Sequence, residues 1–188
     1  MLTLPGRAVI LHNKKNNLCA IFFLTFSYFS DIIITERERK ELREMRKEIW
    51  FDMDGTIANL YGVENWLEML LNGDETPYRN ARPLVRMASL ARILNNLQRK
   101  GWKIGIISWL AKGSTPEYDE RVANAKREWL HEHLRSVNFD RIDIVKYGTP
   151  KQIGRNGILF DDEIQNRENW NGIALDVNDI IENLKALA

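Results

Sequence analysis

The sequence predicts an α/β fold in which a parallel β-sheet is flanked by helices. From residue 48 onward, short apolar runs alternate with longer segments of helical periodicity, a pattern typical of right-handed βαβ units. Polar side chains follow several of these runs directly, as expected where ligands bind at the carboxyl ends of parallel strands. The expected strands are residues 48–53, 103–108, 142–147, 157–161 and 172–175.

Three long segments have the pattern of helices. Residues 83–101 carry apolar side chains at helical spacing, and Pro83 is expected near the helix start. Residues 115–135 begin with Thr115, a typical N-cap, followed by a proline at the first helical position. Residues 176–188 form the last expected helix.

Residues 1–47 are expected to form an N-terminal extension to a domain that spans residues 48–188. Within the extension, residues 18–34 are aromatic-rich and almost uncharged, but slightly short of the roughly 20 apolar residues that span a bilayer. Three interpretations remain open: a membrane-anchoring or signal-like segment, an extra strand or helix, or an upstream start with the natural protein beginning at Met45. Residues 35–48 have the composition of a solvated helix or linker.

The composition is that of a globular protein. The chain has 188 residues, of which 44% are hydrophobic and 28% charged, and its formal net charge is +1. This near-neutral balance gives no reason to expect binding to a nucleic-acid polymer or a membrane surface. The single cysteine, Cys19, excludes an intrachain disulfide or a cysteine-based zinc site and favours a cytoplasmic location.

Five oxygen-bearing side chains end three of the expected strands. Asp52 and Asp54 end the first strand, Ser108 ends the second, and Asp161 and Asp162 end the fourth. Four carboxylates at one edge of a sheet stay ionised together only if a cation lies among them. Oxygen ligands without histidine or cysteine are typical of Mg²⁺, so the four aspartates predict a magnesium-dependent phosphate site.

The two aspartates after the first strand can divide the work of a phosphatase. We expect Asp52 to attack phosphorus and form an aspartyl-phosphate, and Asp54 to act as general acid and then as general base. Because they are two residues apart on an extended strand, their side chains share a face. The turn at Gly55 lets the backbone bend away and leaves amides near the phosphate.

Three short motifs resemble those of the haloacid dehalogenase superfamily. "DMDGT" resembles its first motif, "IIS" ending at Ser108 its second, and "ILFDD" its fourth, in the same order over residues 48–188. The resemblance implies a Rossmann-like domain, Mg²⁺ as cofactor and an aspartyl-phosphate intermediate. The second aspartate of the first motif implies phosphoryl transfer, because the dehalogenases of this superfamily lack it.

The third motif of the superfamily is a lysine, and this chain offers two candidates. Lys151 lies ten residues before Asp161, in the loop leading to the fourth strand. Lys126 lies on the helix that follows the second motif. We favour Lys151, with Lys126 as the alternative, because helix lysines are usually solvated surface residues.

Within the superfamily the sequence is most similar to the 5'(3')-deoxyribonucleotidases. The resemblance rests on "DMDGTIANLY", on a lysine four residues after Ser108, and on the spacing from Lys151 to Asp161. It implies a nucleoside monophosphate as substrate, with Ser108, Trp109, Lys112 and Lys151 on the phosphate and substrate side.

The same resemblance implies a small helical cap over the site. Residues 57–100 would supply it, with a cap helix within residues 61–71. Leu60 stands where that group tends to place an aromatic residue against the base, and Trp66 or Trp109 could replace it. Two alternatives remain: a phosphatase of another small phosphoester, such as a sugar phosphate or a nucleic-acid end, and a non-catalytic domain kept for protein interaction.

Overall fold

The computed structural model describes residues 9–13, 18–22 and 47–188. The chain divides into two compact units, Met1–Glu44 and Met45–Ala188. In the first unit, β1 (Val9–Asn13) pairs antiparallel with β2 (Leu18–Phe22).

The apolar run 18–34 of the sequence therefore begins as a strand. Residues 23–34, and most of the expected helix or linker at 35–48, lie outside the described residues. Among the described residues, no helix is long and apolar enough to cross a membrane.

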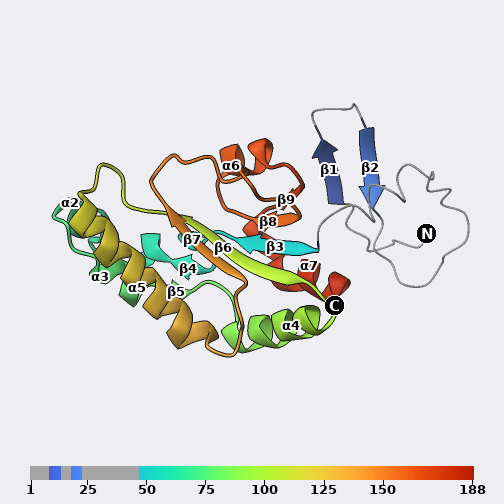
Figure 1. Cartoon of the computed structure of the whole chain (residues 1–188), viewed down its shortest axis with the longest axis horizontal. Coiled ribbons are helices and arrows are strands. Elements are labelled where there is room, and N and C mark those ends of the chain that lie inside the picture. Colours follow the sequence, from blue (N-terminus) through green and yellow to red (C-terminus); the bar gives the residue numbers. More distant parts are fainter. Residues whose placement is uncertain (1–8, 14–17, 23–46) are drawn as a thin grey trace, which may run out of the picture. The chain divides into compact units, whose positions relative to one another are not determined.

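The second unit is built on a parallel five-stranded sheet flanked by helices (Figure 1), which confirms the predicted fold class. Every pairing within this sheet is parallel. The strands lie in the order β7 (Arg141–Val145), β6 (Lys103–Trp109), β3 (Glu48–Phe51), β8 (Ile158–Phe160) and β9 (Ile173–Leu175).

The strand order reverses direction next to β3. The chain moves outward from β3 through β6 to β7, then returns to the other side of β3 for β8 and β9. In open α/β sheets, ligands bind in the crevice outside the carboxyl ends of the strands at such a reversal. We therefore expect a ligand to bind beside the residues that follow β3 and β8.

The central strand β3 is buried on both faces, as expected for the middle of a parallel sheet. Ile49 and Phe51 lie in the main core. Trp50 lies in a separate cluster on the opposite face. A Cβ on Gly105 in the neighbouring strand would lie 2.5 Å from the Trp50 ring, so only glycine fits there.

Three helices cover the main-core face of the sheet. They are α4 (Met87–Arg99), α5 (Pro116–Leu134) and α7 (Ile180–Leu187). Each contributes a stripe of buried side chains to the main core: Leu90, Leu94 and Leu97 from α4, Trp129, Leu130 and Leu134 from α5, and Ile180 and Leu184 from α7.

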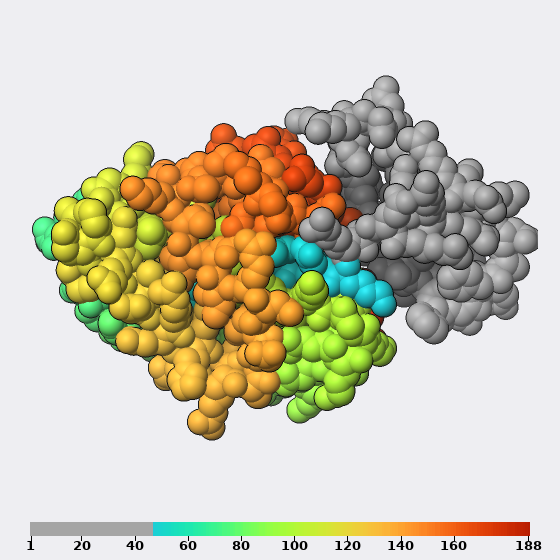
Figure 2. Space-filling view, viewed as in Figure 1, coloured from blue at the N-terminus to red at the C-terminus, as the bar shows by residue number. Residues whose placement is uncertain are grey.

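The opposite face has a smaller apolar cluster, in which Trp50 packs with Ile107, Leu159 and Trp170. The guanidinium groups of Arg141 and Arg155 lie 5.1 and 5.4 Å from the Trp50 ring centre. Figure 2 shows the residues around β3 (cyan) as a strip beside the orange segment that includes β7 and the loop after it.

The segment between β3 and β6 has two parts. The first contains β4 (Ala58–Asn59), η1 (Leu60–Gly62), α2 (Trp66–Leu71), α3 (Thr76–Asn80) and β5 (Arg82–Pro83). It packs on α5 through a small second core of Leu60, Tyr78, Tyr118, Val122 and Ala125. The second part is α4, which belongs to the main core, so within residues 57–100 only the first part is free to act as a cap.

The observed starts of α5 and α4 can be compared with the starts predicted from the sequence. Thr115 is the N-cap of α5, and its side chain accepts a hydrogen bond from the Tyr118 amide, as predicted. The expectation that a helix begins near Pro83 is wrong, because Pro83 pairs with Ala58 in a short antiparallel ladder. The helix begins only at Met87.

Helix boundaries near the chain end also differ slightly from the pattern. The last expected helix begins as a short 3₁₀ turn, η2 (Val177–Asp179), before α7. A further helix, α6 (Ile164–Asn169), follows β8 and was not predicted.

Candidate active site

The chain turns away from the sheet immediately after β3, and this turn carries Asp52 and Asp54. The amides of residues 56–58 all donate to the Met53 carbonyl, at 2.8 to 3.2 Å, and Gly55 supplies the positive φ of 78° that the turn needs. Among the described residues, the amides of Met53 and Asp54 donate to no backbone carbonyl.

Asp161 and Asp162 follow β8 in a loop that α6 holds in place. Arg167 of α6 donates to the carbonyl oxygens of Asp161 and Asp162, at 2.7 and 2.6 Å. The Asp161 carboxylate accepts from the Glu163 amide at 2.9 Å and from Asn166 Nδ2 at 3.1 Å. These bonds fix the direction of the buried Asp161 side chain.

The loops after β3 and β8 are joined by Thr56. Its hydroxyl donates to Asp162 Oδ1 at 3.2 Å and accepts from the Asp162 amide at 3.1 Å. This reciprocal pair sets the distance between the two aspartate-bearing loops.

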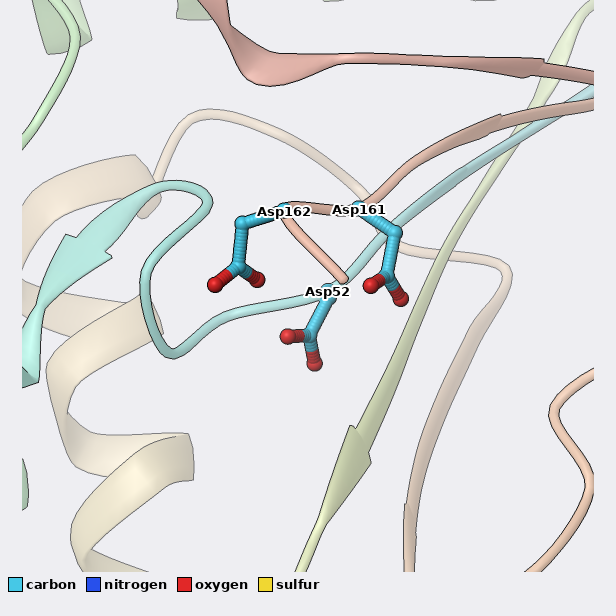
Figure 3. A group of neighbouring side chains, drawn as sticks. All are labelled: Asp52, Asp161 and Asp162. Atoms are coloured by element: carbon cyan, nitrogen blue, oxygen red, sulfur yellow. The ribbon is translucent and has the colours of Figure 1, made fainter. Parts of the chain in front are cut away.

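Asp52, Asp161 and Asp162 converge on one place (Figure 3), where one oxygen from each carboxylate lies within 4.8 Å of the others. Both oxygens of Asp161 accept hydrogen bonds from protein donors. Asp162 Oδ2 has no hydrogen-bond donor among the described residues. Asp162 therefore has the freer oxygen of the two, a distinction that the sequence left open.

The carboxylates raise one another's pKa. Burial, followed by the charge of Asp52, raises the pKa of Asp161 above its ordinary value. Burial, Asp52 and Asp161 together raise the pKa of Asp162 to about 6. Burial also raises the pKa of Asp54, with Asp52 adding to the effect and Lys126 opposing it. The protein alone therefore does not compensate the negative charge of these carboxylates.

Lys151 lies between the two strand-end loops. Its Nζ is 3.0 Å from Asp52 Oδ1 and 2.7 Å from Asp161 Oδ2, and the side chain is buried. Burial works to lower the pKa of Lys151, but the charges of Asp52 and Asp161 outweigh it and the net shift is upward. Lys151 is thus a buried cation that contacts the expected nucleophile.

Lys126 is also buried at the site, and its expected place on the solvated surface is wrong. Its side chain is only 1% exposed, in the middle of α5. Its Nζ lies 2.5 Å from Asp54 Oδ2, 2.9 Å from Ser108 Oγ and 2.7 Å from the Trp109 carbonyl. Both candidate lysines therefore reach the carboxylates, each through a different aspartate.

The remaining expected site residues lie at different depths. Ser108 is fully buried, and its Oγ accepts a hydrogen bond from Lys126 Nζ. Trp109 is half-buried, its indole N–H donates to the Thr149 carbonyl at 2.8 Å, and Lys151 Nζ lies 4.7 Å from its ring centre. Lys112 is exposed, with its Nζ 5.7 Å from the Tyr147 ring centre.

Tyr61 is a further neighbour of the site, and it was not among the expected site residues. A Cβ on Gly55 would lie 2.8 Å from Tyr61 Cε2, so the ring lies directly beside the turn. Burial and then the charges of Asp162 and Asp54 raise the pKa of the Tyr61 hydroxyl. Its ring packs edge-to-face on Trp66, with centres 5.1 Å apart. No pattern in the sequence distinguishes Tyr61 from an ordinary residue of a cap helix.

The residues present fit a divalent, oxygen-preferring cation. The ligand atoms are all carboxylate oxygens, with neither histidine nor cysteine among them. Four carboxylates against two buried lysines leave a formal excess of two negative charges. Mg²⁺ matches that charge and that donor set.

Comparisons with known proteins do not identify the function of this chain. No protein-family model matches the chain, and no curated protein matches it. Among solved structures, it is similar to a D,D-heptose 1,7-bisphosphate phosphatase from Burkholderia thailandensis, with 12% identity and a TM-score of 0.46. That match covers 76% of this chain and 98% of the other. Because both the identity and the TM-score are low, the function rests on the residues of the site.

Proposed function

We propose that this chain is a Mg²⁺-dependent phosphatase of the haloacid dehalogenase type, which hydrolyses small phosphomonoesters through an aspartyl-phosphate on Asp52. One observation carries the proposal. The buried Asp52 carboxylate follows the central strand, lies 3.0 Å from Lys151 Nζ, and has an oxygen within 4.8 Å of oxygens of Asp161 and Asp162. A nucleophile, a cation and a set of metal ligands thus meet at the sheet edge where ligands bind.

In the first half-reaction, an Asp52 oxygen attacks phosphorus as the bond from phosphorus to the leaving oxygen breaks. The protonated Asp54 carboxyl gives its proton to that leaving oxygen. Burial raises the pKa of Asp54, and this shift toward the protonated form supports the role of general acid. Lys151 would hold the phosphoryl oxygens together with the amides of Met53 and Asp54, which donate to no backbone carbonyl among the described residues.

In the second half-reaction, a water oxygen attacks the phosphorus of the aspartyl-phosphate. The Asp54 carboxylate, deprotonated in the first step, takes a proton from that water. The bond from phosphorus to Asp52 breaks, so inorganic phosphate leaves and both aspartates return to their starting states.

The metal would be held by Asp52, Asp162 and the carbonyl oxygen of Asp54. Asp161 would support these ligands without binding the metal directly. When bound, Mg²⁺ supplies positive charge that lets the carboxylates and the phosphate dianion share one small site. Asp161 keeps its place through Lys151, Asn166 and the Glu163 amide.

The preferred substrate within this proposal is a nucleoside monophosphate. Support comes from two aromatic pairs near the carboxylates, Tyr61 with Trp66 and Trp109 with Tyr147, each with ring centres 5.1 Å apart. Flat aromatic side chains stack on nucleobases, at about 1–3 kcal/mol per base. Leu60 is buried in the small second core and does not offer such a surface.

A substrate panel tests both levels of the proposal. Phosphate release is measured from nucleoside 5'- and 3'-monophosphates and from sugar phosphates, with Mg²⁺ and with a chelator. We expect the chelator and Asp52→Asn each to abolish turnover, while the exposed-charge control Glu64→Gln retains it. Intact-mass measurement on Asp54→Asn should reveal a phosphoryl adduct that is absent from Asp52→Asn.

The outcomes separate the two levels of the proposal. Sugar phosphates ranking above nucleotides would remove the nucleotide preference and keep the phosphatase. Activity that survives Asp52→Asn would contradict the mechanism.

A further inference from the structure

Lys126 occupies a position where a lysine is costly. It lies on the apolar stripe of α5, one turn after Val122 and one turn before Trp129, and both of these neighbours are buried. Burying an ammonium group costs several kcal/mol unless its charge and its hydrogen bonds are compensated. Methionine or leucine would fill this helix position without that cost.

The compensation is complete and specific. An ammonium group has three N–H donors, and Lys126 Nζ has three acceptors: Asp54 Oδ2, Ser108 Oγ and the Trp109 carbonyl, at 2.5 to 2.9 Å. The Tyr78 ring faces the same nitrogen, with its centre 4.8 Å away. Lys126 therefore has no N–H left over for a phosphate oxygen.

Lys151 differs in this respect. Its acceptors among the described residues are the carboxylates of Asp52 and Asp161, so one N–H remains for a further partner. The two lysines also contact different aspartates, Lys151 the expected nucleophile and Lys126 the expected acid. Their roles should therefore differ.

We propose that Lys126 is a positioning residue for Asp54: it holds one oxygen of this carboxyl group, so that the other faces the leaving oxygen of the substrate. The inference rests on the proposed function. Asp54 sits on a turn and is partly exposed, so without Lys126 its side chain would rotate among several rotamers. A carboxyl group that spends little time in the productive direction transfers its proton slowly.

If Lys126 positions Asp54, the effect of removing Lys126 should depend on the leaving group of the substrate. An alkyl leaving group, such as the ribose oxygen of a nucleotide, must be protonated as it departs, whereas nitrophenolate leaves as a stable anion. The quantity to measure is kcat/KM, because it contains only the steps up to departure of the leaving group and excludes hydrolysis of the aspartyl-phosphate.

The test compares Lys126→Met with wild type on a nucleoside monophosphate and on p-nitrophenyl phosphate. We expect kcat/KM to fall about 10²-fold on the nucleotide and by less than about tenfold on the nitrophenyl ester. Lys151→Met should lower kcat/KM to the same extent on both substrates. The exposed-lysine control Lys100→Met should leave kcat/KM unchanged on both. Asp54→Asn should show the same leaving-group pattern as Lys126→Met, and combining the two should cause no further loss.

Three results would overturn the inference. Equal losses on both substrates would show that Lys126 only supports the fold or the phosphate. Additive losses in the double variant would show that Lys126 acts independently of Asp54. A wild-type protein that hydrolyses neither substrate would overturn the proposed function itself, and the inference with it, and this result is distinguishable from the other two.

A second variant covers the case in which Lys126→Met fails to fold. Lys126→Gln keeps a hydrogen-bond donor toward Asp54 but removes the charge, and a thermal melt identifies the folded protein. The same leaving-group pattern is expected, with a smaller loss on the nucleotide. An equal loss on both substrates would overturn the role here as well.

Discussion

Lys151 Nζ lies 3.0 Å from Asp52 Oδ1, and both groups are almost completely removed from solvent. The lysine comes from the loop before β8 and the aspartate from the end of β3. The pair therefore ties the expected nucleophile to the loop that leads into the neighbouring strand. It also places a positive charge where the phosphoryl group would gain negative charge.

Lys151→Met should lower kcat/KM by about 10²–10³-fold on every substrate, because a charge that stabilises the phosphoryl oxygens is lost. It should also lower the free energy of unfolding by about 3 kcal/mol, since the buried carboxylates of Asp52 and Asp161 lose their partner. Steady-state kinetics and denaturant titration measure the two effects. The matched control is Lys100→Met, at an exposed position just before β6. Full activity in Lys151→Met would contradict the site as described.

Ionisation of Asp162 should lower the stability of the metal-free protein as pH rises from about 4 to about 6. The pKa of Asp162 is about 6 in the folded chain and near its ordinary value of 3.8 when unfolded, so the folded state binds more protons in this window. Stability therefore falls as the carboxyl group ionises, and it stays lower above pH 6. Thermal melts in chelator across this range measure the slope, and Asp162→Asn should flatten it.

Binding of Mg²⁺ at pH 7 should restore the stability that the protein loses when Asp162 ionises. A ligand that binds only the folded state raises the melting temperature by mass action. The rise should be clear in wild type and much smaller in Asp162→Asn. An equal rise in both proteins would place the metal elsewhere.

Gly55→Ala should abolish Mg²⁺ binding. A Cβ there would collide with the Asp162 carboxylate and lie 2.8 Å from Tyr61 Cε2. Gly113→Ala is a matched control, because Gly113 also has a positive φ but a Cβ there would have no atom within 4 Å. Both variants carry a backbone cost of about 1–2 kcal/mol, but only Gly55→Ala should lose the Mg²⁺-induced rise in melting temperature.

Trp66→Ala should raise KM for nucleoside monophosphates about tenfold and leave KM for a small alkyl phosphate unchanged. The loss reflects removal of a stacking surface, at about 1–3 kcal/mol per base. Tyr61 loses its edge-to-face partner in the same variant. Competition between the two substrates measures the ratio of their kcat/KM values, which should fall for the nucleotide relative to the alkyl phosphate. An unchanged ratio would remove the support that the aromatic pair gives to the nucleotide preference.

The central strands could be predicted because their signal is local. Ile49, Trp50 and Phe51 are consecutive apolar residues, and a strand buried on both faces requires that run. The convergence of Asp52 with Asp161 followed from the rule that parallel strands share a carboxyl edge. The start of α4 could not be predicted in the same way. The Leu84 amide donates to the Ile57 carbonyl at 2.9 Å, and this contact between distant residues draws Pro83 out of the helical pattern.

The place of Lys126 was missed although a signal exists in the sequence. Val122, Lys126 and Trp129 follow the spacing of one helix face, so a lysine interrupts an apolar stripe. Lysines on helices usually lie on the solvated surface, and this general tendency favours exposure where the periodicity of the helix favours burial. The partner that makes burial possible, Asp54, lies 72 residues away and could not be identified from the helix alone.

The pairing of β3 with β8 has a consequence for how the protein is made. It joins residues 49–51 to residues 158–160, so a ribosome must produce most of the domain before the centre of the sheet can close. Until then β3 has a bare edge, and Asp52 has neither Lys151 nor the second pair of aspartates beside it. A nascent chain that stops before Phe160 should be inactive, and the first appearance of activity during synthesis should mark the closure of the sheet.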